Sequence, residues 1–358
     1  MSNFAIDEIV VPDSLDDADE FVEMVALRNL VEAGILGTDA FANSPAELLP
    51  YFRDNPQRVR RHFVARVDGR MIGRSMLTRS PRSDADEAEL NIDVLTSHRE
   101  RGVGTALLAI LEQGAAALGR GVLQSTQPHT ATAGGSRIAA PTGFGDLPAG
   151  DPGVRFLLRN GYALELVARI CVLDLAGSRD AVALQRRLAE QHAGPGYRVH
   201  TWTGDCPPEW LDDIAVLLTG MSTDAPMAGM QVAEDVWDAE RVRQRDARQR
   251  EGGGLLVTSA AEHVPSGLLV AFTEASVPLG EAQPVGQGAT LVLRGHRGHR
   301  LGLLLKAANI QQLLVASPTA TVISTVNAED NVAMLAVNDA LGFRSLGLEG
   351  SWQKTRPL

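Results

Sequence analysis

The chain repeats its own sequence once, and this repeat limits the folds it can adopt more than any other feature. The segment His98-Arg99-Glu100-Arg101-Gly102-Val103-Gly104 matches His296-Arg297-Gly298-His299-Arg300-Leu301-Gly302, which lies 198 residues further along. A second pair of segments, Gly161-Tyr162 and Gly342-Phe343, is 181 residues apart. The two separations differ by 17 residues, about the size of segment 131–153, which is rich in Gly, Pro, Ala and Ser. The 358 residues are therefore predicted to be one fold used twice, with one insertion in the first copy.

Strand-like and helical patterns alternate along both copies, which predicts α/β (α+β) architecture. Asp68-Gly69 is a strong hairpin-turn signal between two strand-like runs. In the first copy the patterns predict strands at 61–68, 71–78, 89–95 and 163–174, a helix at 104–118 and a long loop at 131–153. In the second copy they predict strands at 288–294 and 320–326 and helices at 233–250, 301–316 and 331–340.

A helical pattern between the two copies ends at Gly194-Pro195-Gly196, after which strand and helix patterns begin again. Because glycine and proline together end a helix, this is the expected boundary between domains. The expected organisation is a first domain at 1–175, a linker helix within 176–196, and a second domain at 197–358.

The repeated segment lies where a strand ends and an apolar helix begins, between Val94 and Leu108 in the first copy. Its glycines let the backbone approach a ligand closely, and a helix start presents unpaired N–H groups and a positive dipole end. These features favour an anion site suited to a diphosphate, although a strand–helix turn without a ligand has the same pattern. The segment lacks the Gly-x-Gly-x-x-Gly spacing of dinucleotide-binding folds and the Gly-Lys-Ser/Thr of a Walker loop.

The motif Arg99-x-x-Gly102-x-Gly104 resembles the Arg/Gln-x-x-Gly-x-Gly/Ala motif with which GNAT N-acetyltransferases bind the pyrophosphate of acetyl-CoA. The short helix that ends at Gly161-Tyr162 is also similar to that family. With one such set in each half, the chain looks like the tandem GNAT acyltransferases common in actinobacteria. The resemblance implies two GNAT-like domains, each a mixed, mostly antiparallel sheet with flanking helices. It also implies acetyl-CoA as cosubstrate, no metal, and direct transfer of the acyl group to a primary amine of a small molecule.

The resemblance assigns the acetyl-CoA contacts to the repeated segment in both copies. In the first copy the implied residues are Val94, Arg99, Glu100, Arg101, Gly102, Val103, Gly104 and Thr105. In the second copy they are Val292, Arg297, Gly298, His299, Arg300, Gly302 and Asn331. Both copies depart from the family pattern, because Arg300 replaces the middle glycine of the second motif and the first copy lacks a counterpart of Asn331.

The catalytic groups follow less directly from the resemblance. Members of the family often use a Tyr four residues before the closing Gly as general acid, and those positions here are Leu157 and Asn338. Neither side chain can protonate a leaving thiolate, and Asn338 is kept as a candidate for the second copy. An attacking amine must lose a proton to a base, either a carboxylate or an ordered water. The candidate carboxylates are Glu89 in the first copy, with Glu87 and Asp93 nearby, and Glu274 in the second. A solvated or core-edge position is the alternative for each of them.

The charge balance argues against two classes of partner. Lys plus Arg is 33 and Asp plus Glu is 44, and the net charge of −11 disfavours nucleic acid and anionic membranes and suits a cationic substrate. With two cysteines, Cys171 and Cys206, buried thiols in a reducing cytoplasm are expected rather than a disulfide framework. Residues 1–8 do not resemble a signal peptide, no stretch has the length and apolarity of a membrane span, and the histidines are not spaced as metal ligands.

Two functions are consistent with these patterns. The first is an acetyl-CoA-dependent N-acetyltransferase with at least one working half, acting as a monomer or homodimer. The alternative is a non-catalytic acyl-CoA-binding sensor or scaffold in which one or both GNAT halves are degenerate. The missing Tyr in both halves and Arg300 in the second loop favour the alternative, whereas the intact first loop favours the enzyme.

Overall fold

The structure, a computed structural model, describes residues 4–55, 58–79, 86–131, 134–224, 228–230, 234–278 and 284–356. The chain forms two compact units, each with hydrophobic cores of its own. Unit 1 comprises Met1–Arg169, Met227–Val232 and Gly347–Leu358, and unit 2 comprises Ile170–Pro226 and Ala233–Leu346.

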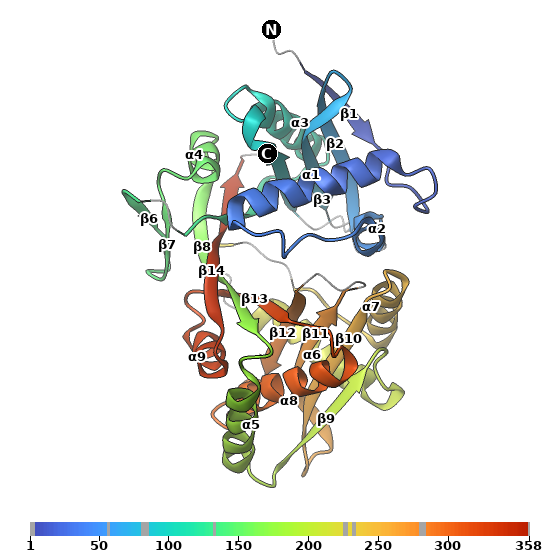
Figure 1. The fold of residues 1–358 in the computed structure, drawn as a ribbon, viewed down its shortest axis with the longest axis vertical. Coiled ribbons are helices and arrows are strands. Elements are labelled where there is room, and N and C mark those ends of the chain that lie inside the picture. The colour runs from blue at the N-terminus through green and yellow to red at the C-terminus, as the bar shows by residue number, and fades with distance from the viewer. Residues whose placement is uncertain are drawn as a thin grey trace. The chain divides into compact units, whose positions relative to one another are not determined.

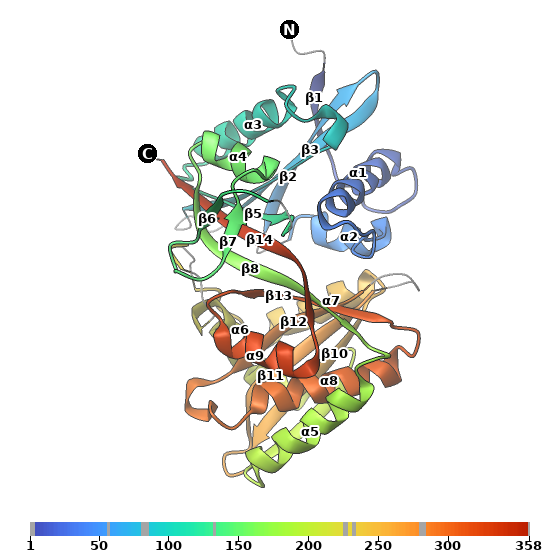
Figure 2. The same cartoon turned by 60° about the vertical axis from the view of Figure 1, so that its left-hand side comes forward.

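Unit 1 contains the elements of the first copy and the C-terminal strand of the chain (Figure 1). Its strands are β1 (Ala5–Ile9), β2 (Val59–Val67), β3 (Arg70–Arg79), β4 (Glu87–Val94), β5 (Val122–His129), the first part of β8 (Ala163–Asp174) and the last part of β14 (Arg344–Thr355), in the order β1-β2-β3-β4-β5-β14-β8. Its helices are α1 (Asp19–Leu36), α2 (Pro45–Phe52), α3 (Val103–Ala117) and α4 (Pro152–Arg159). Figure 2 shows α1 and α2 on one side of these strands and α3 and α4 on the other.

Unit 2 has the same order of elements. Its strands are the second part of β8, β13 (Val322–Ala328), β12 (Val285–Val292), β11 (Leu268–Val277), β10 (Leu255–His263) and β9 (Tyr197–Thr203), in that order across the sheet. Its helices are α5 (Arg179–Ala193), α6 (Leu211–Asp224), α7 (Ala239–Glu251), α8 (Leu301–Ala316) and α9 (Val332–Leu341). The segment β12–α8–β13–α9 of this unit therefore corresponds to β4–α3–β5–α4 of unit 1.

Neighbouring strands are mostly antiparallel, but β4 runs parallel to β5 and β12 runs parallel to β13. The parallel pairing is short, with 87–89 opposite 122–124 in unit 1 and 285–286 opposite 323–324 in unit 2. The rest of β4 and β12 continues without this partner, so the two parallel strands of each pair splay apart. The predicted mixed, mostly antiparallel sheets with flanking helices are thus confirmed in both halves.

One local prediction needs correction, and one helix was not predicted. Segment 131–153, predicted as a loop, contains a hairpin of β6 (Arg137–Ala139) and β7 (Asp146–Pro148) within its described part. Its apolar residue Leu147 is fully buried in the core of unit 1, which explains why a segment rich in Gly and Pro is ordered there. Helix α2 was not predicted, although Ser44 and Glu47 form a capping box at its start.

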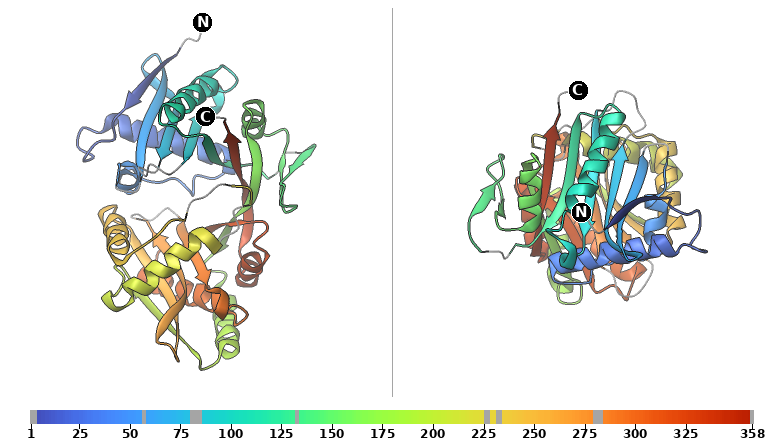
Figure 3. Two further views of the ribbon diagram at one scale, coloured as in Figure 1. Left: turned by 180° about the vertical axis from the view of Figure 1, so that it is seen from behind. Right: turned by 90° about the horizontal axis from the view of Figure 1, so that it is seen from above.

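The last strand of each copy begins in one unit and ends in the other. β8 leaves unit 1 after Arg169 and continues in unit 2, whereas β14 enters unit 1 at Gly347. Figure 1 and the left panel of Figure 3 show β14 beside β8. Helix α5, expected as a linker, belongs to unit 2 and packs against α8. The boundaries of the two sequence copies stay a prediction, and the compact units differ from them most clearly at 347–358.

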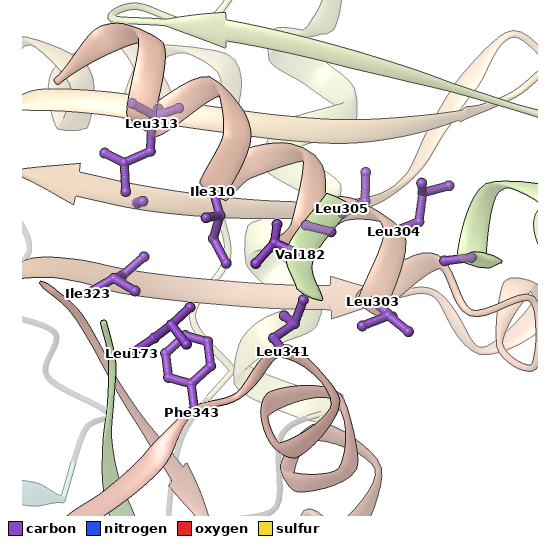
Figure 4. Close-up of a cluster of buried hydrophobic side chains, with 14 of the residues drawn as sticks. Leu173, Val182, Leu303, Leu304, Leu305, Ile310, Leu313, Ile323, Leu341 and Phe343 are labelled. Atoms are coloured by element: carbon purple, nitrogen blue, oxygen red, sulfur yellow. The ribbon is translucent and has the colours of Figure 1, made fainter. Parts of the chain in front are cut away.

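Each unit has an aliphatic core around the helix that follows the splayed strand. In unit 2, the leucines and isoleucine of α8 meet Leu173 of β8, Val182 of α5, Ile323 of β13 and Phe343 (Figure 4). In unit 1, Leu107 and Leu111 of α3 share a core with Trp352 of β14, whose side chain is fully buried. The burial of such side chains supplies about 1.5–3 kcal/mol each.

Helix α3 lies so close to β3 that no side chain fits between them at Gly73. A Cβ added there would lie 3.1 Å from Val103 Cγ1 and 3.2 Å from Leu107 Cδ1. We expect Gly73→Ala to lower the free energy of unfolding of unit 1 by about 1–3 kcal/mol, because the helix must move away from the strand. Urea unfolding measures the change. Gly150→Ala, whose new Cβ has no heavy atom within 4 Å, is the control, and an equal loss in both variants would contradict this explanation.

Candidate active site

A cavity of about 670 Å³ lies in unit 1 where β4 and β5 are no longer paired. It is lined by residues of α1, β4, the loop before α3, α3 itself, β5 and α4, among them Ile92, Val94, Arg99, Gly104, Thr105, Ser125, Gln127, Phe156 and Tyr162. The cavity is large enough for the arm of a cofactor-sized ligand. An extended ligand can pair there with the backbone groups that the splay leaves free.

The loop between β4 and α3 has a backbone conformation that its sequence explains. Arg99 Nε donates a hydrogen bond of 3.1 Å to the carbonyl oxygen of Val94, which ties the loop to the end of the strand. Glu100 and Gly102 have positive φ angles of 61° and 85°, and Gly102 caps α3 without a side-chain hydrogen bond. The first N–H groups of α3, at Val103, Gly104 and Thr105, therefore have no capping side chain and are available to an anion.

The loop of the second copy has the same backbone shape with its glycine at another position. Arg297 Nε donates to the carbonyl oxygen of Val292 over 3.1 Å, as Arg99 does to Val94. Gly298 and Arg300 have positive φ angles of 86° and 56°, so Arg300 caps α8 in the left-handed region. A non-glycine residue in that region costs about 1–2 kcal/mol, and the fold of this loop is kept despite that cost.

Protein side chains surround the second loop. Tyr197 Oη lies 3.0 Å from His296 Nδ1, and the ring of His299 lies 5.1 Å from that of Tyr197. His192 Nε2 is 3.1 Å from the carbonyl oxygen of Gly298. Burial lowers the pKa of His296, and the neighbouring imidazoles of His263 and His299 lower it further. An aromatic cluster therefore packs against the loop that corresponds to the candidate diphosphate site.

Helix α4 adds positive charge to the cavity of unit 1. Arg155 and Arg159 both line the cavity, and Arg155 Nη2 lies 3.1 Å from Glu100 Oε1 in the loop. Guanidinium groups suit phosphate recognition because of their fixed fork of donors. Neither arginine was predicted as a site residue, although their i, i+4 spacing places them on one face of the helix that precedes Gly161.

A chain of buried hydrogen bonds fixes the start of α4. Asp151 caps the helix by accepting from the N–H groups of Gly153 and Val154, and His129 Nδ1 lies 2.9 Å from its Oδ1. Trp352 Nε1, which can only donate, lies 3.4 Å from His129 Nε2, so His129 donates from Nδ1 to Asp151. Burial raises the pKa of Asp151, but the hydrogen bonds from His129 and the two N–H groups outweigh it, so this pKa lies below its usual range.

The end of β14 also holds the far end of the cavity. Lys354 Nζ donates to Glu112 Oε1 over 2.9 Å and to the carbonyl oxygen of Asn160 over 2.8 Å. Tyr162 Oη donates to the same Glu112 oxygen over 3.1 Å, and burial raises the pKa of Tyr162 above its usual value. Tyr162, the tyrosine in the cavity wall, is thus already a hydrogen-bond donor to the protein.

The candidate carboxylates lie in different environments. Glu89 on β4 is half exposed, and its Oε2 is 3.9 Å from Arg58 Nη1. Glu274 on β11 is ion-paired with Arg245 of α7 at 3.0 Å, and burial raises the pKa of Glu274 although Arg245 opposes this. Glu89 therefore has a weaker ionic partner than Glu274.

Both asparagine candidates of the second copy make hydrogen bonds within unit 2. Asn338 is 1% exposed, accepts from Lys306 Nζ over 2.7 Å, and donates from Nδ2 to Asn327 over 2.7 Å. Asn331 accepts from the N–H of Met334 and so caps α9, as Asp151 caps α4. Asp151 of the first copy thus has the capping role that Asn331 has in the second copy. This counterpart of Asn331 was not predicted from the sequence.

The structure brings most predicted contacts of the first copy together. The predicted residues that line the cavity are Val94, Arg99, Glu100, Gly102, Gly104 and Thr105. Val103, the first residue of α3, is buried, and Arg101 is exposed and outside the lining. The predicted contacts of the second copy, Val292 to Gly302, lie in unit 2 and do not contribute to this cavity.

The part of the chain that the structure describes offers neither a metal site nor a membrane-spanning helix. It contains no group of three or more His, Cys, Asp or Glu side chains arranged to hold a metal ion. Within the same residues, no helix combines the length and apolarity needed to cross a bilayer.

Comparison with known proteins places the chain among acetyltransferase folds. Residues 33–133 match the model of the acetyltransferase (GNAT) family. A tandem GNAT protein from the clavulanic acid biosynthesis pathway is 23% identical, covers 99% of each chain and has a TM-score of 0.72. A GCN5-related N-acetyltransferase from Sphaerobacter thermophilus is 14% identical, covers 100% of this chain and 97% of its own, and has a TM-score of 0.63.

A glucosamine N-acetyltransferase region of a fungal multi-domain β-N-acetylglucosaminidase is similar over 99% of this chain and 38% of its own, with 14% identity and a TM-score of 0.60. No curated protein sequence matches the chain significantly. Residues 33–133 therefore match the GNAT family model, and over its whole length the chain shares the fold of a tandem GNAT protein.

Proposed function

We propose that this protein is an acyl-CoA-dependent N-acyltransferase that binds acetyl-CoA in the cavity of unit 1 and acetylates a primary amine of a small molecule. One observation carries the proposal: a single cavity combines an unpaired strand edge, the uncapped start of α3 and three arginines. The match of residues 33–133 to the GNAT family supports acyl transfer as the reaction.

In the proposed complex, the start of α3 binds the diphosphate. The N–H groups of Val103, Gly104 and Thr105 and the helix dipole attract the negative charge, and Arg155 and Arg159 of α4 add charge-assisted contacts. The pantetheine arm pairs with the free edge of β4, which brings the thioester to the region of Ile92 to Val94. A backbone N–H of that segment stabilises the negative charge on the thioester oxygen in the transition state.

The reaction needs one proton removed before attack and one delivered after it. The ammonium of the substrate loses a proton to a carboxylate, and the neutral nitrogen attacks the thioester carbon to form a C–N bond. The C–S bond breaks, and the CoA thiolate takes the second proton released by nitrogen. Leu157 stands at the position of the usual tyrosine acid and Tyr162 is bonded to Glu112, so this proton reaches sulfur through solvent.

For the second copy we propose a supporting role. Arg300 occupies the left-handed cap position, and Tyr197 and His192 contact its loop. Asn338 and Glu274, the catalytic candidates of this copy, are engaged by Lys306 and Arg245. The non-catalytic alternative inferred from the sequence thus applies to unit 2, which contributes β14 to unit 1.

The remaining parts of the proposal concern partners and location. Both cysteines are buried free thiols, which agrees with a protein that works in the reducing cytoplasm. The acidic net charge of −11 favours a small cationic amine over nucleic acid or an anionic membrane surface. We propose a monomer or homodimer without a metal cofactor.

Gly104→Asp tests the proposed acetyl-CoA site. An acidic residue in the first turn stabilises a helix, so α3 should stay folded, but the new carboxylate repels the diphosphate. We expect acetyl-CoA affinity, measured by calorimetry, to fall about 100-fold, which corresponds to about 2.7 kcal/mol.

Gly302→Asp, at the matching position of α8, is the control and should leave the affinity unchanged. If Gly302→Asp abolishes binding and Gly104→Asp does not, the site lies in unit 2 instead. Wild-type protein that does not bind acetyl-CoA would overturn the proposal.

A further inference from the structure

The cavity of unit 1 reaches from one side of the sheet to the other. Leu108 of α3 and Phe156 of α4 line it on one side, and Val31 and Ile35 of α1 line it on the other. Figure 2 shows these helices on opposite sides of the strands of unit 1. A ligand bound at the start of α3 can therefore extend between the splayed strands β4 and β5. Its far end then points towards α1.

The charges on the two sides of the sheet differ in sign. The side of α3 and α4 carries Arg99, Arg155 and Arg159. The side of α1 carries three glutamates from three elements, Glu32 of α1, Glu89 of β4 and Glu349 of β14. The electric fields of Glu32 and Glu89 both act on the carboxyl group of Glu349, so the three groups are close in space.

Strand register also places these glutamates on one face. Glu89 is opposite Gln124, whose Nε2 donates to Gln353 Oε1 over 3.0 Å. Glu349 lies four residues before Gln353 on β14, and side chains four residues apart on a strand share a face. Glu349 is opposite Pro128, which lines the cavity. The C-terminal strand thus places a carboxylate beside the α1 side of the cavity.

Two of the acidic groups on this face are neutralised by arginines. Glu32 Oε2 lies 2.6 Å from Arg28 Nη2 on α1. Asp93 Oδ2 lies 2.6 Å from Arg74 Nη2 on β3. These pairs leave no net negative charge for a ligand, so the uncompensated charge belongs to other residues.

Glu89 and Glu349 carry that uncompensated charge. Glu89 has only the distant Arg58 at 3.9 Å, and the carboxylate of Glu349 has no hydrogen-bond or ion-pair partner among the described residues. On the neighbouring strand β8, Glu165 turns its carboxylate to Gly229. Burial raises the pKa of Glu349 to about 7, and the charges of Glu32 and Glu89 add to this effect. A carboxylate with such a pKa can exchange a proton near neutral pH.

Buried polar atoms without partners lie on the same face. Thr78 of β3 is opposite Glu89 and only 3% exposed, and its Oγ1 has no hydrogen-bond partner. The Oδ1 of Asn91, two residues after Glu89, also lacks one. An unsatisfied buried polar group costs about 1–3 kcal/mol. Carboxylate and amide oxygens accept hydrogen bonds and cannot donate them, so the missing ligand is rich in donors.

Resting on the proposed function, we propose that Glu89 and Glu349 form the acceptor site of unit 1 and that it takes a small amine with two ammonium groups. Glu349 contacts the reacting ammonium beside the splay, and Glu89 holds the second. Asn91 and Thr78 accept further hydrogen bonds from the nitrogens. Two uncompensated carboxylates match two positive charges, which gives the substrate class.

Glu349 takes part in one of the two proton transfers of this reaction. Its carboxylate takes a proton from the reacting ammonium, and the resulting neutral nitrogen attacks the thioester carbon. The second nitrogen proton ends on the sulfur of CoA as the C–S bond breaks. Glu349 then releases its proton to solvent, so the products are the acetylated amine, CoA thiol and one proton. The base comes from the last strand of the chain, although the rest of the site belongs to the first copy.

The test compares Glu349→Gln and Glu89→Gln in the full chain, with Glu165→Gln as the matched control on β8. The probes are the diamines putrescine and cadaverine, with n-butylamine as the singly charged comparison. Calorimetry measures the binding of acetyl-CoA and of each amine, and release of CoA thiol measures turnover. We expect Glu349→Gln to lower kcat with the diamines about 100-fold, the usual range for loss of a general base, while acetyl-CoA binding is unchanged.

Glu89→Gln is expected to raise KM for the diamines about tenfold with little change in kcat, because it removes a binding charge and not the base. Glu165→Gln should behave as wild type. Equal use of n-butylamine and the diamines, or an unchanged kcat in Glu349→Gln, would overturn the acceptor site. Wild-type protein that binds acetyl-CoA but no diamine overturns this inference alone, whereas loss of both kinds of binding overturns the proposed function as well.

Discussion

A chain that ends at Leu346 is expected to lose acetyl-CoA binding and the cooperative unfolding of unit 1. Removal of the following residues deletes the part of β14 that lies between β5 and β8 in the sheet of unit 1. It removes the pairing of 348–355 with 122–129 and the fully buried Trp352. The loss should exceed about 5 kcal/mol, the lower end of the stability of a typical domain. Circular dichroism during thermal unfolding and calorimetry with acetyl-CoA measure the two effects.

Strand complementation provides the control for this truncation. A synthetic peptide of residues 344–356 supplies the missing hydrogen-bond partners and should restore acetyl-CoA binding when added to the shortened chain. The milder variant Trp352→Phe keeps a large ring but removes the donor to His129, and should cost about 1–3 kcal/mol. A shortened chain that binds acetyl-CoA as tightly as the full chain would show that β14 is dispensable for the site.

The stability of unit 2 is expected to rise with pH between about 7 and 10.5 because of Lys306. This side chain is 1% exposed, and burial lowers its pKa to about 7, although Cys171 opposes the shift. In that pH range the unfolded chain binds the proton and the folded unit does not, so folding becomes more favourable as pH rises. Below pH 7 the folded unit bears the full free-energy cost of burying the charged ammonium of Lys306. At about 1.4 kcal/mol per pKa unit, the rise amounts to about 5 kcal/mol.

Lys306→Met should remove this dependence on pH. At pH 7 the variant should be more stable than wild type by about 2 kcal/mol. It no longer buries an ammonium group, and the lost hydrogen bond to Asn338 offsets only part of that gain. Urea unfolding followed by the fluorescence of the tryptophans of unit 2, in a Trp352→Phe background, measures the effect. Lys354→Met is the control, since Lys354 has Glu112 as ionic partner and lies in unit 1.

The sequence contains two lysines, Lys306 and Lys354, which makes a direct measurement simple. Protein labelled with 15N at the lysine side chains gives two signals, and the one lost in Lys306→Met is expected to titrate near pH 7. Burial lowers the pKa of Lys354 as well, so both signals should titrate below free lysine. A signal of Lys306 that titrates at the value of free lysine would contradict this prediction.

The local part of the site could be predicted from sequence because it depends on neighbouring residues. Gly102 occupies a left-handed backbone position, and Gly104 lies where the helix start meets the cavity, as the motif indicated. The repeat also predicted the second loop correctly as a strand–helix turn, although Arg300 replaces its glycine. Such features are visible in a short window because backbone conformation and helix start are decided within a few residues.

The parts that depend on distant residues could not be predicted. His129 and Trp352 meet although 223 residues separate them, and no local pattern links them. Arg155 and Arg159 follow an insertion whose β6–β7 hairpin was read as a loop. The entry of β14 into unit 1 depends on its pairing with β5, which lies far earlier in the chain, and no local pattern indicates that partner.

The order of strands has a consequence for the synthesis of the protein. The ribosome completes β5 and the first part of β8 long before it reaches β14, which fills the place between them. At about 5–20 residues per second, synthesis of residues 170–343 lasts roughly 9–35 s. During that time the edges of β5 and β8 lack the strand that pairs with them. A translation product that ends before β14 would therefore lack one wall of the proposed acyl-CoA site and its proposed base.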